Sequence, residues 1–416
     1  MKINNQHIDD ILSENIESIF ATFEATEIEK NNEVKTVEKK TNNRKIWSDS
    51  SKSPKREGFS TPLAPLKVLL EHYNKLSEYE YKEILGYSEI YFFGKTKKVF
   101  SEPFCDSELY YKSEEGDHLA YRYEIVKALG EGNFGLVLEC RDHKTNTQVA
   151  IKVHRKGKKF EKVAEDEVSV LDSLGTHEGI VSKLSQFQFR GHSCIVYELL
   201  STDLYNFLSN SNFCGLNMGL IRRIAIQLVI GLKHIHSTGF IHCDLKPENV
   251  LFKAFNKSIV KIADFGLACH QDAVVYSYIQ SRFYRAPEVI LEAGYSNKID
   301  IWSLGCILFE LYNGTPLFSG FDETDQLHRI IETLGKVPTN LLILSKRKEK
   351  IGMRYSVNGM KIVPRSRPLC SLVDSAEAEF LDFLQECLEI DPQKRLSSES
   401  ALLHPWIQGS KIIKNK

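Results

Sequence analysis

Residues 242–249 read His-Cys-Asp-Leu-Lys-Pro-Glu-Asn, and residues 264–266 read Asp-Phe-Gly. The first stretch fits the pattern H-x-D-L-x-x-x-N, in which the Asp can accept the proton of a hydroxyl group and the Asn can ligate Mg²⁺. The Asp of the second stretch offers a carboxylate to a metal that bridges two phosphates. We therefore predict Asp244 as a proton acceptor, and Asn249 and Asp264 as metal ligands.

A glycine-rich stretch lies upstream of these motifs. Residues 130–137 read Gly-Glu-Gly-Asn-Phe-Gly-Leu-Val, and glycines allow backbone N–H groups to approach phosphate oxygens. Taken alone, the pattern also fits a β-hairpin turn or a dinucleotide-binding turn, although the latter needs a helix directly after the glycines. Residues 149–152 read Val-Ala-Ile-Lys, so Lys152 ends a strand where it can reach nucleotide phosphates. The ordered series, closed by Ala286-Pro287-Glu288, favours a nucleotide site.

A carboxylate partner for Lys152 is expected on the helix that follows it. Residues 164–171 read AEDEVSVL, which is typical of a helix with one acidic face. Glu167 is the predicted partner of Lys152, and Glu165 and Asp166 are the competing candidates.

The distribution of strand and helix patterns predicts an α+β fold with two lobes. Residues 121–185 alternate in strand fashion around one helical stretch, whereas helical periodicity dominates from residue 204 onward. We expect a small β-rich N-lobe at about 121–200, a larger α-helical C-lobe at about 201–406, and a small-molecule site in the cleft between them.

The N-terminal 120 residues divide into two predicted parts. Residues 1–60 are rich in Glu, Lys, Asn and Ser, which predicts a mostly disordered tail, while residues 61–120 are expected to fold. The tail contains one helical face, formed by Ile8, Ile11, Leu12, Ile16, Ile19, Phe20 and Phe23. This face indicates either a docking helix for a partner or, as the favoured alternative, a helix that folds back on its own domain. Residues 407–416 are a basic C-terminal tail.

Composition excludes several classes of protein. The chain has 54 Lys and Arg against 55 Asp and Glu, so its net charge of -1 provides no global attraction to nucleic acid or to an anionic membrane. Its apolar stretches are too short to span a bilayer. The nine scattered cysteines and the absence of a signal pattern at residues 1–10 predict a cytoplasmic location, with the nucleus as the alternative. Basic runs at residues 55–56 and 346–348 fit nuclear entry, or more simply solvated surface charge.

With its motifs in this order, the segment 121–406 resembles the eukaryotic protein kinase family. The resemblance implies that the protein uses ATP and Mg²⁺. It implies that Asp244 is the catalytic base and that Lys246 contacts the transferring phosphate. It also implies that Lys152 and Glu167 form an ion pair that orients the nucleotide.

The same resemblance assigns roles outside the motifs. Asp300 is expected to hold the catalytic-loop backbone, and Arg395 is expected to pair with Glu288. The residues implied to bind the nucleotide are Leu129, Gly130, Gly132, Gly135, Val137, Ala150, Lys152, Glu198, Leu200, Asp203 and Leu251.

Further features narrow the resemblance to one family of kinases. Cys243 replaces the Arg that is usual in the catalytic loop, residues 276–288 read YSYIQSRFYRAPE, and residues 76–94 read LSEYEYKEILGYSEIYFFG. These features resemble the dual-specificity tyrosine-regulated kinases (DYRK) of the CMGC group, second class, whose accessory region would lie at 61–118. Residues 267–269 depart from the pattern, because they read Leu-Ala-Cys where the family more often has two serines before the cysteine.

The function implied is transfer of the γ-phosphoryl group of ATP to Ser and Thr of protein substrates, with tyrosine phosphorylation confined to the kinase itself. A preference for Pro after the target and Arg before it is expected, with Glu248 meeting the Arg. One alternative is a catalytically inactive scaffold, which should lack a lysine, base or metal ligand that this chain keeps. The other is the neighbouring homeodomain-interacting kinase family, which the segment 61–118 argues against.

Two predictions concern regulation. Phosphate on Tyr278 would pair with Arg282 and Arg285 and order the activation segment, because guanidinium groups bind phosphate in a bidentate manner. Cys243 and Cys269 are expected to lie close enough for a reversible disulfide, although two inert buried thiols are the favoured alternative.

Overall fold

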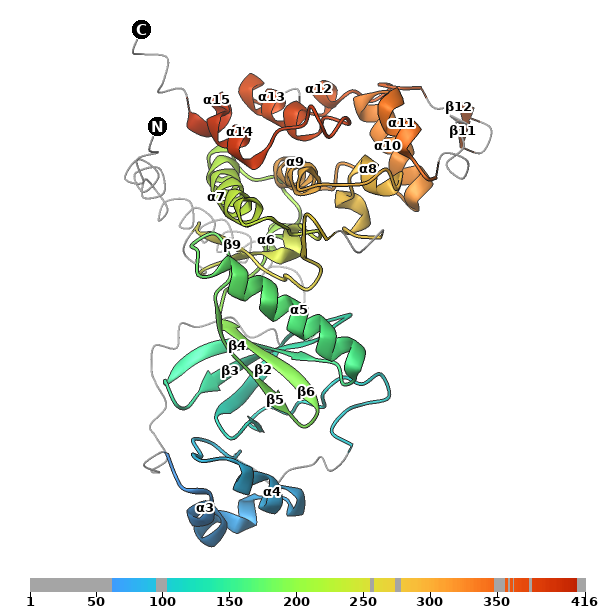
Figure 1. Ribbon diagram of the computed structural model, residues 1–416. Helices are drawn as coiled ribbons and strands as arrows, with labels where there is room; N and C mark the ends of the chain where they lie inside the picture. Colours follow the sequence, from blue (N-terminus) through green and yellow to red (C-terminus); the bar gives the residue numbers. More distant parts are fainter. Residues whose placement is uncertain are drawn as a thin grey trace, which may run out of the picture. The chain divides into compact units, whose positions relative to one another are not determined.

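The computed structural model (Figure 1) describes residues 62–94, 103–254, 258–273, 278–347, 356–357, 360–361, 363–373 and 376–409. The predicted helical face in the tail and Tyr276 lie outside these residues. The chain divides into two compact units. The first unit comprises Met1–Glu131 with Val137–Val149, and the second comprises Gly132–Leu136 with Ala150–Lys416.

The described part of the first unit begins with short helices. They are α3 (Pro65–His72), η2 (Tyr73–Lys75), α4 (Glu78–Glu83) and η3 (Ile84–Gly86). Helix α4 starts with a capping box, in which the side chains of Ser77 and Glu80 each bond the backbone N–H of the other residue. These helices enclose a small core made of Leu63, Val68, Leu76, Ile84, Ile90, Phe93 and Tyr121. The accessory segment therefore shares a small hydrophobic core with Tyr121, just before β2.

Strands complete the first unit. They are β1 (His118–Leu119), β2 (Tyr123–Gly132) and β3 (Gly135–Asp142), and β1 pairs antiparallel with β2. Residues of β3 alternate between buried and partly exposed, as expected of a strand with one face against a core. The start of β2 is buried and its end at residues 128–132 is exposed, so the glycine-rich stretch begins at the surface.

Strand β4 (Thr147–His154) belongs to the second unit from Ala150 onward. The second unit continues with α5 (Lys158–Leu174), β5 (Lys183–Phe189) and β6 (His192–Glu198). Strand β4 is hydrogen-bonded to β6, and β6 pairs antiparallel with β5. Helix α5 packs on β6 and ends at Leu174, and the capping residue Gly175 has a φ of +64°, which suits glycine. This sheet and helix carry Lys152 and Glu167.

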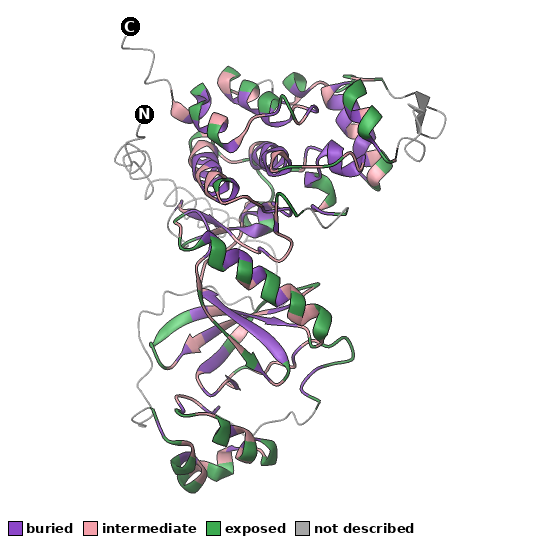
Figure 2. Ribbon diagram, in the orientation of Figure 1, coloured by how far each residue is buried: buried purple, intermediate pink, exposed green. Residues whose placement is uncertain are grey.

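Helices make up most of the remaining second unit (Figure 1). They are α6 (Leu204–Asn210), α7 (Met218–Ser237), α8 (Pro287–Ile290), α9 (Lys298–Asn313), α10 (Glu323–Leu334), α11 (Thr339–Leu344), α12 (Leu369–Leu372), α13 (Ala378–Cys387), α14 (Ser398–Leu403) and α15 (Pro405–Gln408). Figure 2 shows α9 as almost wholly buried, and it packs against α7 and α13. The predicted α+β fold, with a β-rich part before a helical part, is confirmed.

Short strands and 3₁₀ turns lie between the helices of the second unit. They are β7 (Phe240–Ile241), η4 (Pro247–Asn249), β8 (Val250–Phe252), β9 (Val260–Ile262), β10 (Cys269–His270), η5 (Arg282–Tyr284), β11 (Ser356–Val357) and β12 (Met360–Lys361). Three antiparallel pairs form, which are β7 with β10, β8 with β9 and β11 with β12. The pair of β8 and β9 brings residues 249 and 263 together, because the Ala263 N–H donates to the Asn249 carbonyl at 2.9 Å.

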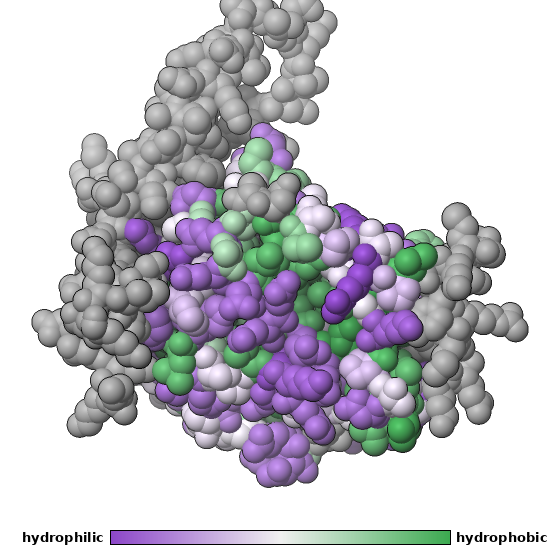
Figure 3. All heavy atoms as spheres, turned by 90° about the horizontal axis from the view of Figure 1, so that it is seen from above, coloured by the Kyte–Doolittle hydropathy of each residue, from purple (hydrophilic) through white to green (hydrophobic). Residues whose placement is uncertain are grey.

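The surface of the second unit in Figure 3 mixes hydrophilic and hydrophobic residues. Among the described residues, no helix has both the length and the apolar character that a transmembrane span requires.

Candidate active site

Lys152 lies on β4 and is held by two carboxylates. Its Nζ donates to both oxygens of Glu167 on α5, at 3.0 and 2.8 Å, and to Oδ1 of Asp264 at 2.7 Å. The competing candidates Glu165 and Asp166 are exposed, and Asp166 pairs with a lysine on its own helix. The predicted pairing of Lys152 with Glu167 is confirmed.

All three groups stay charged at neutral pH. Burial alone would lower the pKa of Lys152, but Asp264 and Glu167 outweigh burial and raise it. Burial would likewise raise the pKa of each carboxyl, yet Lys152 lowers the pKa of Glu167 and lowers that of Asp264 to about 2. The charged Lys152 ammonium group lies between Glu167 and Asp264 and can turn from them toward phosphate oxygens.

Asp264 and Asn249 offer the oxygen ligands that Mg²⁺ prefers. The Asp264 side chain keeps 39% of its surface exposed, although its Oδ1 accepts from Lys152. Nδ2 of Asn249 donates to the Asp244 carbonyl at 2.8 Å, so the amide oxygen of Asn249 is left to act as a ligand. The donor chemistry of these two side chains therefore fits a divalent cation.

Asp244 is held by donors from Ser281, Lys246 and Asn249, and Nδ2 of Asn249 reaches its Oδ2 at 3.4 Å. Its Oδ1 accepts from the backbone N–H of Ser281 at 3.0 Å and from the Ser281 hydroxyl at 2.9 Å, and its Oδ2 accepts from Lys246 at 2.7 Å. Lys246 also reaches the Ser281 hydroxyl at 3.3 Å. Ser281 was not predicted as a site residue, because nothing in the sequence around it indicates a contact with Asp244.

The loop that carries Asp244 is held by Asp300 of α9. Asp300 accepts from the backbone N–H groups of His242 and Cys243 at 2.9 and 3.1 Å and contacts Nε2 of His236 at 2.9 Å. Cys243 has a φ of +66°, which costs energy for a residue with a side chain. The expected contact of Asp300 with the loop backbone is confirmed, and it stabilises this conformation.

Arg395 and Glu288 form a bidentate pair at 2.6 and 2.9 Å, and both side chains are fully buried. This confirms the pairing that the kinase resemblance implied. Glu288 follows Pro287 in α8, so the pair joins the end of the activation segment to the segment before α14.

The residues implied to bind the nucleotide fall in both units. Leu129, Gly130 and Val137 belong to the first unit, whereas Gly132, Gly135, Ala150, Lys152, Glu198, Leu200, Asp203 and Leu251 belong to the second. Within the second unit, Asp203 and Leu251 form a β-bridge, and the Asp203 carboxylate caps α6 at 2.8 Å from the Asn206 N–H. Glu198 forms an ion pair with Lys261, in which Oε1 and Nζ are 2.6 Å apart.

The three glycines of the glycine-rich stretch differ in the space available for a Cβ atom. At Gly135 a Cβ atom would lie 2.2 Å from the Val153 carbonyl oxygen, so close packing on β4 requires glycine. At Gly130 and Gly132 a Cβ atom would meet nothing within 4 Å. The first two positions are therefore open to a ligand that approaches the backbone.

Tyr278 of the activation segment has 65% of its surface exposed. The guanidinium of Arg285 lies over the Tyr278 ring at 4.1 Å and also donates to the carbonyls of Ile279 and Gln280. The guanidinium of Arg282 instead donates to the Phe321 carbonyl at 2.5 Å. The structure thus brings Arg285 against Tyr278 and directs Arg282 to the backbone before α10.

Cys243 and Cys269 approach each other, with their Sγ atoms 3.6 Å apart, and both are free thiols. The hydrogen bond that they share and the burial of Cys243 raise the pKa of the Cys243 thiol. The predicted proximity is confirmed.

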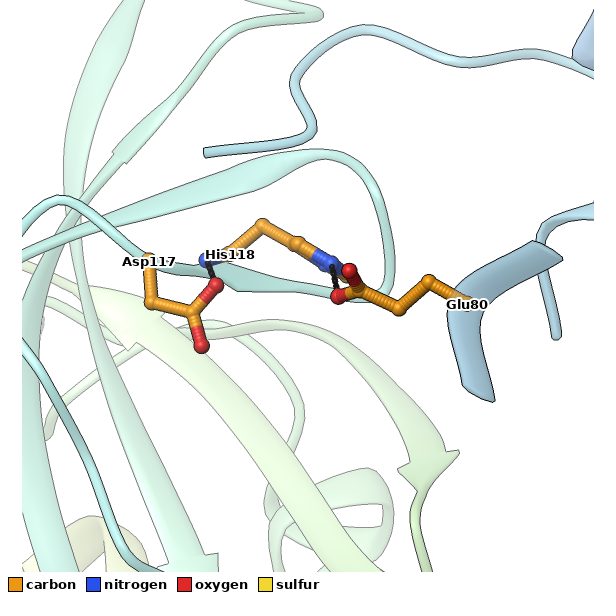
Figure 4. Close-up of side chains that lie close together, drawn as sticks. All are labelled: Glu80, Asp117 and His118. Atoms are coloured by element: carbon orange, nitrogen blue, oxygen red, sulfur yellow. Dashed lines mark hydrogen bonds and ion pairs between the residues drawn. The ribbon is translucent and has the colours of Figure 1, made fainter. Parts of the chain in front are cut away.

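A second cluster of potential metal ligands lies in the first unit, at Glu80, Asp117 and His118 (Figure 4). Nδ1 of His118 accepts from the Tyr121 N–H at 3.2 Å, so Nε2 carries the proton and donates to Glu80 at 2.9 Å. Asp117 accepts from the His118 N–H at 2.6 Å. Hydrogen bonds therefore account for the arrangement of this cluster, and they link α4 to β1.

Residues 123–407 match the protein kinase domain family. The chain is 40% identical over 375 residues to "Dual specificity tyrosine-phosphorylation-regulated kinase 2" of Drosophila melanogaster, covering 84% of this chain and 52% of the fly protein. It is 39% identical over 383 residues to "Dual specificity tyrosine-phosphorylation-regulated kinase 4" of Homo sapiens, covering 87% of this chain and 73% of the human protein.

The chain thus spans about half the length of the fly relative and nearly three quarters of the human one. The match covers the accessory segment as well as the kinase domain, since 87% of the chain is more than the family model alone includes. The chain belongs to the protein kinases and, among them, to the dual specificity tyrosine-phosphorylation-regulated kinase family.

Proposed function

We propose that the protein transfers the γ-phosphoryl group of ATP to Ser and Thr hydroxyls of protein substrates, using Mg²⁺, and phosphorylates its own Tyr278. The observation that carries this proposal is the arrangement of Asp244 between Lys246 and Ser281. A carboxylate fixed in this way can accept a hydroxyl proton while an ammonium group lies beside it.

Each side chain contributes positioning or charge. Asp244 accepts the proton of the substrate hydroxyl, and Lys246 neutralises charge on the transferring phosphoryl group. Lys152 orients the α- and β-phosphates and is itself held by Glu167. Mg²⁺, when bound by Asp264 and Asn249, neutralises charge on the β- and γ-phosphates.

An inactive scaffold is the competing proposal. Retention of the lysine, the base and both metal ligands argues against it, as does the ordered geometry of Asp244. Incubation with ATP and Mg²⁺, followed by intact mass and mapping of modified residues, decides between them. Lys152→Arg and Asp264→Asn should each abolish phosphorylation without unfolding the protein, and near wild-type turnover in either variant would refute the mechanism.

We further propose that substrates carry an Arg upstream of the target residue, bound beside Glu248. Glu248 and Glu310 line a cavity of about 550 Å³ together with Tyr205, Phe213 and Tyr284. Arg282 also lines it, and its guanidinium donates to the Phe321 carbonyl. Two carboxylates and aromatic faces suit a guanidinium group. A Pro after the target residue is expected from the family likeness, and a peptide array without a penalty for loss of the Arg or the Pro would refute this specificity.

A cytoplasmic or nuclear location is also proposed. All nine cysteines are free thiols in the structure, which suits a reducing compartment. A fluorescent fusion in cells tests this, and secretion of the fusion would overturn it.

A further inference from the structure

Two polar side chains without an assigned role meet the carboxylate of Glu167. The Tyr197 hydroxyl donates to Oε1 at 2.7 Å, and Nε2 of His154 lies 3.3 Å from Oε2. Both oxygens also accept from Lys152. Glu167 is 1% exposed, His154 is fully buried and Tyr197 is 8% exposed, so water is excluded from this group.

The positions of these side chains follow from their strands. Lys152 and His154 are two residues apart on β4 and therefore lie on the same face of the strand. Tyr197 reaches the same point from β6, and Glu167 reaches it from α5. The Glu167 carboxylate is thus contacted from two neighbouring strands. Lys152 and His154 reach it from β4, and Tyr197 reaches it from β6.

The chemistry of the contacts assigns the donors. An ionised carboxylate only accepts hydrogen bonds, so the Tyr197 hydroxyl must donate its proton to Glu167. Burial and the charge of Glu167 raise the pKa of Tyr197 well above its ordinary value, which keeps that proton in place. His154 faces acceptors on both ring nitrogens, because Nδ1 lies 3.3 Å from the Ser193 carbonyl.

Lys152 cannot satisfy Glu167 alone once nucleotide binds. An ammonium group has three N–H donors, and here two contacts go to Glu167 and one goes to Asp264. Any donation to a phosphate removes a donor from one of these carboxylates. A buried carboxylate that loses a donor is costly unless other donors remain.

We propose that Tyr197 and His154 are positioning residues for nucleotide binding, which hold the Glu167 carboxylate while Lys152 turns toward the phosphates. This inference rests on the proposed function only in naming the nucleotide. It predicts that loss of either hydrogen-bond donor to Glu167 weakens nucleotide affinity.

The first test is Tyr197→Phe, which removes the hydroxyl and keeps the ring. The expected result is an affinity for Mg·ADP weakened about three- to tenfold, measured by isothermal titration calorimetry on the full chain. The matched control is Tyr121→Phe, because the Tyr121 hydroxyl donates to Glu83 at 2.9 Å in the first unit. The control also loses a Tyr–Glu hydrogen bond and should leave Mg·ADP affinity unchanged.

The second test separates the two ring nitrogens of His154. His154→Gln keeps an N–H donor where Nε2 lies, toward Glu167, whereas His154→Asn keeps one only where Nδ1 lies, toward Ser193. The Gln variant should bind Mg·ADP nearly as wild type does, and the Asn variant should bind more weakly. Thermal unfolding of each variant identifies any variant that fails to fold. Because Tyr197 and His154 are substituted separately, one misfolded variant still leaves the other position to test the proposal.

The outcomes separate this inference from the proposed function. Tyr197→Phe and His154→Asn binding Mg·ADP as tightly as wild type would overturn it, and so would Tyr121→Phe weakening binding equally. A His154→Gln variant as weak as His154→Asn would remove His154 from the inference, since side-chain volume would then explain the loss. A wild-type chain that binds Mg·ADP but phosphorylates no protein would refute the proposed function and leave the binding test intact.

Discussion

At the scale of single residues, the site depends on hydrogen bonds that keep charges in defined places. Ser281 contributes both its N–H and its hydroxyl to one oxygen of Asp244, which leaves Lys246 on the other oxygen. Hydrogen bonds to an ionised group are worth about 1.5–3 kcal/mol, more than those between neutral groups. The orientation of the proposed base therefore depends on one small side chain from the activation segment.

We predict that Ser281→Ala lowers kcat about ten- to a hundredfold with little change in KM for ATP, because the Asp244 carboxylate loses one of its charged hydrogen bonds. Ser281→Thr, which keeps the hydroxyl, is the matched control and should retain most activity. Steady-state kinetics with a Ser-containing peptide checks this. Equal losses in the Ala and Thr variants would show that the hydroxyl is not what matters.

Glu310 is a residue whose change of protonation should be measurable near neutral pH. Burial raises its pKa to about 7, although the Tyr284 hydroxyl, which donates at 2.6 Å, works in the opposite direction. The carboxyl is therefore neutral below about pH 7 and charged above it. Its attraction for a substrate guanidinium must grow as pH rises through this value.

We predict that KM for a peptide with an upstream Arg falls between pH 6 and pH 8, while KM for the same peptide with Ala in place of the Arg changes much less. Glu310→Gln keeps an acceptor for Tyr284 and should reduce the pH dependence, leaving the part due to Glu248, whose pKa burial also raises. Peptide kinetics over this range tests the prediction. A pH profile that is unaltered in the Gln variant would assign the titration to another group.

At the scale of elements, the activation segment joins the catalytic loop at several points. Gln280 donates its backbone N–H to the Cys243 carbonyl at 2.9 Å, and its side chain bonds Ser303 of α9 at 2.8 Å. Arg285 pairs with Glu323 of α10 at 2.9 Å. The segment is therefore anchored after Tyr278, at the residues that place Ser281 on Asp244.

Phosphate on Tyr278 should strengthen this anchoring through Arg285, whose guanidinium already lies over the ring. We predict that protein made in a host without tyrosine kinases carries phosphate on Tyr278, and that Tyr278→Phe lowers activity. Arg282→Ala with Arg285→Ala should imitate the loss of phosphate, although Arg285→Ala also removes buried contacts and should lower the melting temperature. Phosphopeptide mapping of active protein with unmodified Tyr278 would contradict this view of activation.

The strand pair β7 and β10 brings Cys243 and Cys269 into contact next to the catalytic loop. Oxidation of both thiols would join the loop to the segment after Asp264, and we predict a reversible loss of activity on mild oxidation that dithiothreitol restores. Cys269→Ser is the control and should remain active under the same oxidant. Non-reducing peptide maps of oxidised protein with both cysteines free would favour the inert pair instead.

At the scale of the whole molecule, the first unit has its own core and its own polar links. Glu80 is fully buried and bonds His118, and Tyr121 packs in the core and bonds Glu83. Removing one partner of a buried hydrogen bond lowers the stability of the fold by more than the hydrogen bond itself contributes. The other partner then stays buried without a hydrogen bond. The accessory segment is thus secured to β1 by specific contacts as well as by apolar packing.

From the family likeness we expect the accessory segment to assist phosphorylation of Tyr278. Deletion of residues 61–118 should prevent this modification, and Glu80→Leu should reduce it by loosening α4 from β1. Mass spectrometry of Tyr278 in each variant tests this, with Glu78→Leu at the exposed start of α4 as the control. Full phosphorylation of Tyr278 in the deletion variant would separate the accessory segment from activation.

The sequence by itself determined the α+β fold, the accessory segment and the family. It did so because short motifs such as 242–249 and 264–266 combine a local backbone conformation with residues that perform a defined chemistry. The pairings of Lys152 with Glu167 and of Arg395 with Glu288 could be named in advance, since the family resemblance supplied the long-range partner.

Only the tertiary structure decided which polar groups complete these pairs. Ser281 reaches Asp244 across 37 positions, and Tyr197 reaches Glu167 across 30. Such contacts depend on how several elements pack, and no periodicity within one element encodes them. The same holds for Arg282. The sequence predicts its guanidinium beside Tyr278, but in the structure the guanidinium donates to the Phe321 carbonyl, which lies just before α10.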